Sequence, residues 1–223
     1  MKKFIAILCV LVLALSLFTA CKNDKKTIDA AIERYVASNP TGMVANTTQR
    51  FGEKELLGTY TLTIGTVDGK TAAVYTEDYE RRRTTDEGAG EVYVPTVEEV
   101  SVVKEYIEGK GVRTDRKGKW VKDEEFNLPS KGSIALNLDK KLLEDIEYNN
   151  NTLTFYVKAE NTEAVLGFSE KVDVRVSIVD DGALVVGVNI FWVLPANEAE
   201  QTVATSTEIN VTYTYGYQKL DIA

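Results

Sequence analysis

Carboxylates are the only abundant side chains in this sequence that could serve acid–base or nucleophilic chemistry. The chain has 34 aspartates and glutamates, no histidine and two cysteines. Without histidine, Ser-His-Asp and Cys-His catalysis and zinc sites built on imidazole are excluded. Two carboxylates that meet in one cleft suffice for glycoside cleavage, but no spacing among the 34 acids singles out a pair. A carboxylate hydrolase is therefore the weakest of three hypotheses, and we predict that the protein is not an enzyme.

Glycine- and aspartate-rich segments of the sequence do not match known ligand-binding loops. There is no Gly-x-Ser-x-Gly elbow and no phosphate-binding glycine loop before a helix. Asp68-Gly69 and Asp180-Asp181-Gly182 lack the series of oxygen ligands of a calcium loop and are typical of tight turns. We therefore predict neither a cofactor nor a metal site.

The first 20 residues have the layout of a signal peptide. Lys2-Lys3 precedes an apolar run from Phe4 to Leu15 and a short tail that ends at Ala20. Phe18-Thr19-Ala20-Cys21 resembles the lipobox of bacterial lipoproteins, in which the cysteine becomes the first mature residue and carries the lipid. An ordinary signal peptide with a coincidental cysteine and an uncleaved membrane anchor are the alternatives. All three interpretations predict export.

The lipobox resemblance implies a cell-envelope protein anchored through Cys21, with palmitate among its acyl chains. More than one chain is needed because a single chain holds a protein only marginally. Residues 21–26 then form a lipidated cysteine and a charged tether, and residues 27–223 form one domain without any thiol. Loss of Lys2 and Lys3 with the signal changes the formal net charge from −8 to −10. An acidic domain disfavours nucleic acid as a partner.

The most continuously apolar stretch is the pair of segments Val172–Ile178 and Ala183–Val193. The second segment is polar only at Asn189, so both of its faces should be covered, which predicts the middle of a sheet. A three-residue loop with glycine in the left-handed position would join the two segments. This loop predicts the pairs Ile178 with Leu184, Val176 with Val186 and Val174 with Val188.

Alternating segments elsewhere predict about ten strands in total. Thr59–Val67 and Lys70–Tyr79 flank Asp68-Gly69, and a two-residue turn there sets Leu62 and Ile64 opposite Tyr75 and Ala73. The threonine-rich segment Met43–Arg50 is predicted to be an edge strand. Thr202–Tyr217 is predicted to be a long strand with one large-residue face, namely Ile209, Val211, Tyr213, Tyr215 and Tyr217.

Helical spacing predicts two or three short helices. Ile28, Ala31, Ile32, Tyr35 and Val36 form one stripe, which Asn39-Pro40 ends. A second helix is expected around Leu142, from the spacing of Leu138, Leu142, Leu143 and Ile146, and a single turn is expected to start at Asn161. Short connections and many strands give an antiparallel α+β fold class.

The order of these elements resembles the LolA/LppX-type lipoprotein superfamily. The residues that carry the resemblance are the lipobox, the turn segments Tyr106-Ile107-Glu108-Gly109-Lys110 and Gly118-Lys119-Trp120, the helix near Leu142 and the closing Tyr213-Thr214-Tyr215. The resemblance implies a large curved antiparallel sheet, an unclosed β-barrel, with two or three short helices on its concave side. It also implies a hydrophobic cavity for lipid or acyl chains.

We therefore predict a membrane-anchored envelope lipoprotein that binds a lipid or another apolar ligand in this cavity. The expected lining comprises Tyr60, Leu62, Ile64, Val174, Val176, Leu184, Val186, Val188, Ile190, Trp192, Val211 and Tyr213. The alternative is an envelope scaffold or regulator that binds another protein, with a filled core and with Met43–Arg50 as the edge that pairs with a partner strand.

Overall fold

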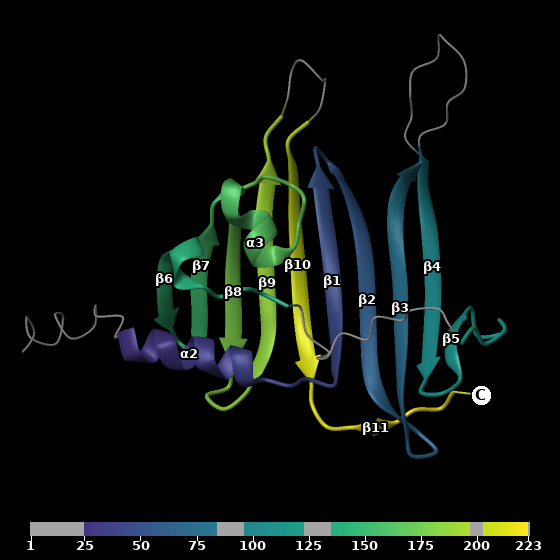
Figure 1. Ribbon diagram of the computed structural model, residues 1–223. Coiled ribbons are helices and arrows are strands. Elements are labelled where there is room, and N and C mark those ends of the chain that lie inside the picture. Colours follow the sequence, from purple (N-terminus) through teal and green to yellow (C-terminus); the bar gives the residue numbers. More distant parts are fainter. Residues whose placement is uncertain (1–24, 84–95, 123–134, 197–202, 223) are drawn as a thin grey trace, which may run out of the picture.

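The computed structural model describes residues 25–83, 96–122, 135–196 and 203–222 (Figure 1). The helices are α2 (Lys25–Ala37), α3 (Thr162–Leu166) and the single 3₁₀ turns η1 (Lys140–Leu142) and η2 (Ala159–Asn161). The strands are β1 (Gly42–Phe51), β2 (Lys54–Val67), β3 (Lys70–Arg83), β4 (Thr96–Ile107), β5 (Gly111–Thr114), β6 (Glu144–Asn149), β7 (Thr152–Val157), β8 (Val174–Asp180), β9 (Val185–Leu194), β10 (Thr205–Thr214) and β11 (Gln218–Lys219). The predicted signal peptide and the predicted lipidation site Cys21 lie outside the described residues.

All these strands belong to one 11-stranded sheet built from two meanders. Its order is β5-β4-β3-β2-β1-β10-β9-β8-β7-β6, and the short β11 pairs in parallel with β2. β1 and β10 join the meanders through ten antiparallel pairs, from Gly42 with Thr214 to Phe51 with Thr205. The predicted large, unclosed antiparallel sheet is thereby confirmed, although with two short helices the fold is mostly β.

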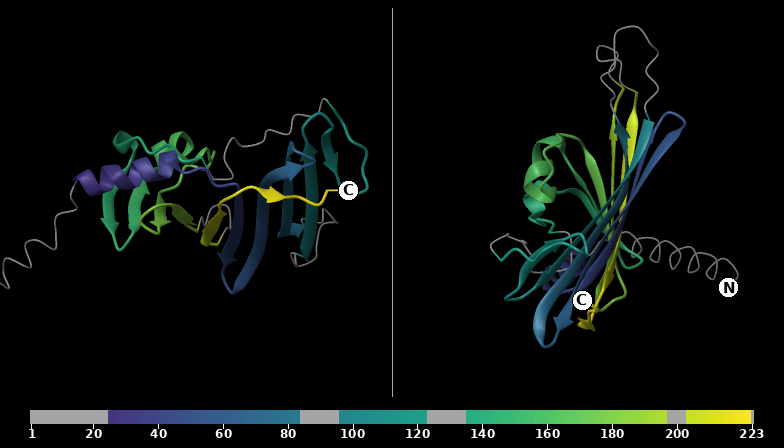
Figure 2. Two further views of the ribbon diagram at one scale, coloured as in Figure 1. Left: turned by 90° about the horizontal axis from the view of Figure 1, so that it is seen from below. Right: turned by 90° about the vertical axis from the view of Figure 1, so that its right-hand side faces the viewer.

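Both helices lie on the same face of the sheet and over the same half of it. α2 packs against β6 and β7, and Figure 2 shows α2 and α3 on one side of the twisted sheet. Ala31 and Tyr35 of α2 and Val165 and Leu166 of α3 enter the main core. The helical stripe predicted before Asn39-Pro40 is therefore confirmed, and the helix that precedes the first meander covers the second.

A polar cluster fixes the C-terminal end of α2 to two strand turns. Nη2 of Arg34 donates to Oδ2 of Asp180 at 3.0 Å and to the hydroxyl of Tyr148 at 2.9 Å. The Tyr148 hydroxyl donates in turn to the carboxylate of Asp180, which also accepts the backbone N–H of Gly182 at 2.8 Å. The Asp180 side chain is only 3% exposed, so these donors replace the hydrogen bonds that water would otherwise make to it.

The β2–β3 hairpin follows the predicted register. Val67 pairs with Lys70 across Asp68-Gly69, and both turn residues have positive φ angles, 51° and 78°. This is the geometry of a type I′ turn, which matches the twist of antiparallel strands. Ile64 therefore lies opposite Ala73, as expected.

The predicted register of the β8–β9 hairpin is wrong. The observed pairs are Ile178 with Val188, Val176 with Ile190 and Val174 with Trp192. The register shifts between Val179 and Asp180, which is the signature of a β-bulge. At this bulge Val185 turns into the core, whereas Leu184 and Val186 are 41% and 36% exposed. Gly182 has the predicted positive φ, 93°.

Two further predictions need correction. The segment around Leu142 is one 3₁₀ turn followed by β6, because Leu138 and Leu143 reach the core from extended backbone on either side of the turn. The segment Met43–Arg50 is not an edge, since β1 is hydrogen-bonded to β2 on one side and to β10 on the other. The predicted single helical turn near Asn161 is confirmed as α3.

The face of the sheet opposite the helices, which we call the outer face, carries a row of polar side chains where the two meanders meet. Asn189 donates to Asn210 at 2.7 Å and to Glu208 at 2.9 Å, and Thr59 donates to Asn46 at 3.1 Å. These residues lie side by side on β9, β10, β1 and β2, so their amides and hydroxyls bond across strands. The one polar residue of β9 therefore belongs to a surface that water can reach.

Candidate functional site

Most residues predicted to line a cavity come together in a packed core. Val174, Val176, Val188, Ile190, Val211 and Tyr213 are between 0% and 6% exposed. Phe155, Leu153 and Val157 of β7 fill the same cluster, together with the helix residues. Trp192 is partly buried at its rim, with its ring 5.4 Å from that of Phe168. These side chains have each other as neighbours, which is how a filled core differs from a ligand cavity.

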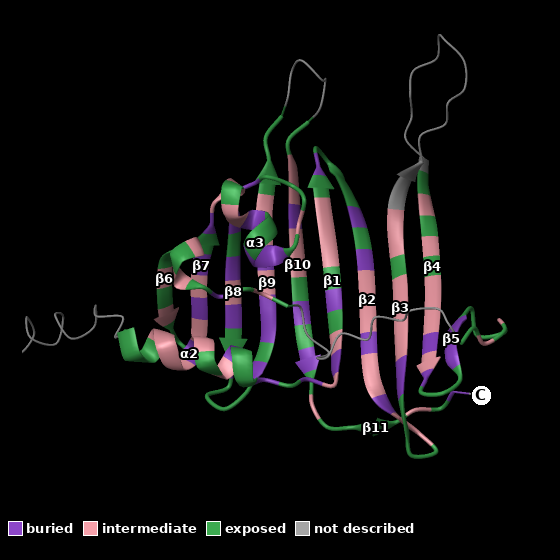
Figure 3. Ribbon diagram, in the orientation of Figure 1, coloured by how far each residue is buried: buried purple, intermediate pink, exposed green. Residues whose placement is uncertain are grey.

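The other predicted lining residues lie elsewhere. Leu184 and Val186 face solvent at the bulge of the β8–β9 hairpin. Tyr60, Leu62 and Ile64 lie on the core-side face of β2, where Tyr60 packs against the margin of the main core, Leu62 is 3% exposed and Ile64 is partly exposed. Figure 3 shows that buried positions are dense beneath α2 and α3 and sparser on β2, β3 and β4. With respect to the helices among the described residues, the sheet therefore has a covered half, β6–β10, and a half on which none of them packs, β2–β5, which we call the uncovered half.

Four tyrosines lie on the core-side face of the uncovered half, and we call them the tyrosine surface. They are Tyr60 on β2, Tyr75 and Tyr79 on β3, and Tyr106 on β4. All four side chains are partly exposed, and the rings of Tyr60 and Tyr79 stack with their centroids 6.2 Å apart. Alternation in Tyr75-Thr76-Glu77-Asp78-Tyr79 is the sequence signal that would have revealed this surface.

A carboxylate lies among these phenols. The Tyr75 hydroxyl donates to Oε1 of Glu77, the residue between the two β3 tyrosines on this face. Partial burial first, and then the hydrogen bond to Glu77 and its negative charge, raise the pKa of Tyr75. Partial burial, followed by the charge of Glu77, also raises the pKa of Tyr60. The phenols of Tyr60 and Tyr75 therefore stay neutral at physiological pH, and the four tyrosines offer aromatic faces and hydroxyl groups to a ligand.

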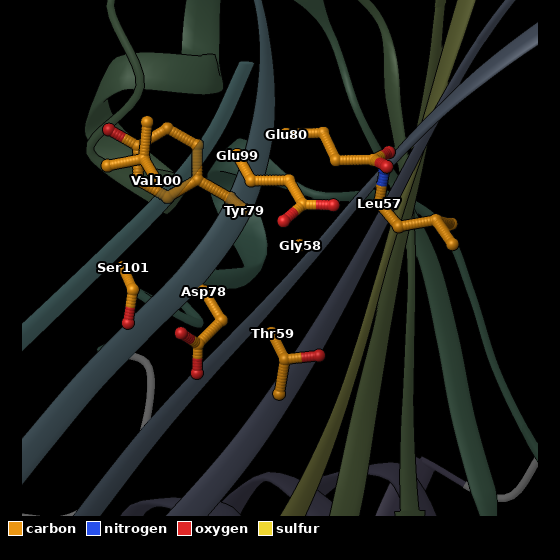
Figure 4. A pocket seen from close by; sticks show the side chains of 9 residues that line it. All are labelled: Leu57, Gly58, Thr59, Asp78, Tyr79, Glu80, Glu99, Val100 and Ser101. Carbon is orange, nitrogen blue, oxygen red and sulfur yellow. The ribbon is translucent and has the colours of Figure 1, made fainter. Parts of the chain in front are cut away.

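The outer face of the uncovered half has an open groove of about 420 Å³, which we call the acidic groove (Figure 4). Its lining comprises Leu57, Gly58, Thr59, Asp78, Tyr79, Glu80, Glu99, Val100 and Ser101. Pairing of β2 with β3 stops at Gly58 and Tyr79, and Oε2 of Glu80 then accepts the N–H of Leu57 at 2.9 Å. The groove thus begins where two strands separate, and its described lining includes three carboxylates and no lysine or arginine.

A second open groove, of about 640 Å³, lies on the outer face of the covered half, and we call it the aromatic groove. Tyr156, Arg175 and Phe191 lie side by side across three strands within it. Lys158 at its end contacts Asp173 at 3.5 Å and Glu144 at 3.6 Å, and these charges raise the pKa of Lys158. Within the described part of the chain, no ion pair forms to Arg175.

A small second core lies on the outer face at the far end of the uncovered half. Ala72, Ile107 and Ile222 are its buried members, and Trp120 packs on them. Next to it, Nε of Arg113 donates to Glu105 at 2.7 Å, and the guanidinium lies 4.8 Å from the centre of the Trp120 ring. The charges of Arg113 and Glu105 are each other's close partners, so these two residues form a structural ion pair.

In the part of the chain that the structure describes, no group of three or more acidic, histidine or cysteine side chains could hold a metal ion. No helix among the same residues has the length and apolarity needed to cross a membrane. Comparisons with protein-family models, with curated proteins and with solved structures found no match to this chain. The function must therefore be inferred from the surfaces of the molecule itself.

Proposed function

We propose that this chain is an exported, lipid-anchored envelope protein that binds another protein through the uncovered half of its sheet. The single observation behind the proposal is the tyrosine surface, where four partly exposed tyrosines lie on three strands and none of the described helices packs on them. Tyrosine is enriched in protein interfaces because it combines a large rigid apolar ring with a hydrogen-bonding hydroxyl.

The filled core is why a protein partner is preferred to an enclosed lipid. Val174, Val176 and Ile190, expected to line a cavity, are 0% exposed among their neighbours, so an acyl chain would have to displace them. On the tyrosine surface an acyl chain would keep one side in water, whereas a protein can cover the whole surface. The anchor at Cys21 and the resemblance to LolA-type lipoproteins remain predictions.

Site-specific photocrosslinking in cells that make the protein tests the proposal. A photoreactive phenylalanine analogue at Tyr79 or Tyr106 should give a discrete protein adduct. The same analogue at Tyr156, on the outer face of the other half, is the matched control and should not give that adduct. Equal adducts at all three positions, or only lipid adducts at Tyr79 and Tyr106, would show that the tyrosine surface does not bind a protein.

Binding of an apolar ligand is the second candidate, and the aromatic groove favours it. This groove is the larger of the two, and Tyr156 and Val193 in its lining are 43% and 45% exposed. A ligand with an apolar body and an anionic group would contact Phe191 and Arg175 together. Native mass spectrometry of the purified protein should then show a bound small molecule that a Phe191→Ser variant loses, and a Val44→Ser variant, changed elsewhere on the outer face, retains.

A further inference from the structure

The two edges of the sheet differ in how well they are closed. At one edge, β6 is interrupted by a register shift between Glu144 and Glu147, Asp145 has a positive φ of 48°, and α2 packs alongside. Such bulges keep an edge from pairing with further strands. At the other edge, the short β5 covers only residues Lys104–Ile107 of β4, and Val112 of β5 bridges to Val121 on its far side.

The rest of β4 is a regular edge strand. Residues 96–107 pair with β3 without a register shift, and no described strand pairs with residues 96–102 on the other side. Figure 1 shows β4 extending well beyond the short β5 at this margin of the sheet. We call residues 97–101 the β4 edge.

Hydrogen bonds at the closed end of β4 show which backbone groups of the β4 edge point outward. The carbonyl of Val103 accepts from Asp115, next to β5, whereas the N–H of Glu108 donates to Thr71 on the β3 side. Backbone groups of consecutive residues alternate between the two sides of an antiparallel strand. The N–H and C=O groups of Val97, Glu99 and Ser101 therefore point away from β3, in position to receive another strand.

The side chains beside this edge indicate the chemistry of such a strand. Glu99 and Ser101 are on the outer face and line the acidic groove with Asp78 and Glu80. A strand added along β4 would place every second side chain on this face, next to Glu99 and Ser101. Three carboxylates in the groove favour lysine or arginine there, and Val100 on the opposite face favours an apolar residue.

A second copy of the same chain does not fit this edge. Two β4 edges paired antiparallel about Glu99 would place Glu99 opposite Glu99 and Glu98 opposite Val100, with four glutamates in the joint. Like charges directly opposite each other destabilise a strand pair. The occupant must therefore carry charge of the opposite sign.

We propose that the β4 edge binds an extended segment of a partner protein, added as a further strand, with lysine or arginine at alternate positions directed to the acidic groove. This inference rests on the proposed protein-binding function and names the chemistry of the partner. Backbone hydrogen bonds along the edge supply affinity, and the groove supplies selectivity for basic side chains.

Peptide binding to the full chain, purified in detergent, tests the proposal. One fluorescent eight-residue probe alternates lysine with valine, and a matched probe alternates glutamate with valine. Anisotropy titrations should show the lysine probe binding at least tenfold more tightly than the glutamate probe. A Glu99→Gln variant should bind the lysine probe roughly fivefold more weakly. Failure of the unmodified chain to bind the lysine probe overturns the proposal.

Proline separates strand addition from simple charge attraction. Ser101→Pro removes one outward N–H and leaves the bonds to β3, whereas Ser101→Ala keeps that N–H. Ser101→Pro should weaken lysine-probe binding at least tenfold and Ser101→Ala by less than twofold. Equal binding by both variants means charge attraction alone and overturns the proposal.

A modified probe guards against misfolding of the proline variant. N-methylation of every second residue of the lysine probe removes the backbone N–H donors along one side of the extended peptide without altering its charge. Methylation of either the odd-numbered or the even-numbered residues is possible. The probe methylated on the side that faces β4 should lose tenfold in affinity, and the other probe should not. Equal affinity of the two methylated probes overturns strand addition. Photocrosslinking at Tyr79 tests protein binding to the tyrosine surface independently. A protein adduct at Tyr79 combined with failed peptide binding would therefore reject strand addition at the β4 edge and leave the proposed function standing.

Discussion

The covered and uncovered halves of the sheet use the same strand alternation but differ in what lies on the core-side face. In the covered half, β7 and β8 direct Phe155, Val174 and Val176 beneath two helices, and all three are 0% exposed. In the uncovered half, β3 directs Tyr75, Glu77 and Tyr79 to the same face, and all three remain partly exposed. Aromatic and charged side chains tolerate contact with water, whereas aliphatic side chains do not. The residue types on the core-side face therefore distinguish the covered half, which stabilises the fold, from the uncovered half, which we propose binds a partner.

A cavity in the covered half tests this difference most strongly. Phe155→Ala removes a fully buried ring from the main core and should lower the free energy of unfolding by about 3–5 kcal/mol. Urea unfolding followed by circular dichroism measures the change. A loss below ~1 kcal/mol would mean that the core beneath the helices does not carry the stability.

Removing the carboxylate that holds α2 is the next largest change. Asp180→Ala leaves Arg34 and Tyr148 without their shared acceptor, and we expect a loss on the order of 2–3 kcal/mol in the same urea assay. Asp173→Asn, at an exposed ion pair, is the control and should cost less than ~1 kcal/mol. Similar losses in both variants would contradict a specific role for the Arg34 cluster.

Alkaline pH gives a separate measure of burial beneath α2. Burial raises the pKa of Tyr35 to about 12 from its ordinary value of 10.0. The stability due to its neutral phenol is complete below pH about 10 and is lost as pH rises toward about 12, because the unfolded chain releases its proton first. Tyr35→Phe should therefore lose roughly 2 kcal/mol less over this interval than the unmodified chain. An unchanged pH profile would contradict the prediction, and Tyr217→Phe, at a 76% exposed site, is the control.

The smallest expected effect on stability lies in the uncovered half. Tyr79→Ala removes a partly exposed ring and one stacking contact, so it should cost about 1 kcal/mol or less. Crosslinking from Tyr106, at the other end of the tyrosine surface, should nevertheless fall severalfold, because tyrosines carry disproportionate binding energy in interfaces. A large loss of stability with unchanged crosslinking would mean that Tyr79 stabilises the fold and does not contribute to binding.

Local signals in the sequence predicted the elements that depend on local chemistry. Asp68-Gly69 determines its own turn and therefore the β2–β3 register, and the stripe from Ile28 to Val36 requires a helix. The β8–β9 register escaped prediction because sliding a strand by an even number of residues keeps every side chain on the same face, so the apolar pattern of Ala183–Val193 fits several registers equally well. Only the bulge, which is not encoded in periodicity, separates Val185 from its exposed neighbours.

Positions that depend on distant chain segments were predicted least well. β1 looked like an edge because its residues are polar, yet its neighbour β10 comes from the other end of the chain. The spacing of Leu138 and Leu142 predicts a helix where β6 lies, although the alternation of Ile146 and Tyr148 indicates a strand. The sequence identified Tyr60 and Leu62 as facing the core side, but not that the helices would stop short of them.

The β1–β10 joint has a consequence for how the molecule is made. Each meander consists of neighbouring hairpins that can form as soon as their own residues are available, whereas β1 must wait for a strand encoded nearly a full chain length later. Closing so long a loop is slow, since its entropic cost comes before any contact rewards it. A chain that emerges from a secretion channel in order would carry β1 with one open side until residues 205–214 follow. Time-resolved protection of β1 amides from hydrogen exchange should therefore lag behind that of β2–β3.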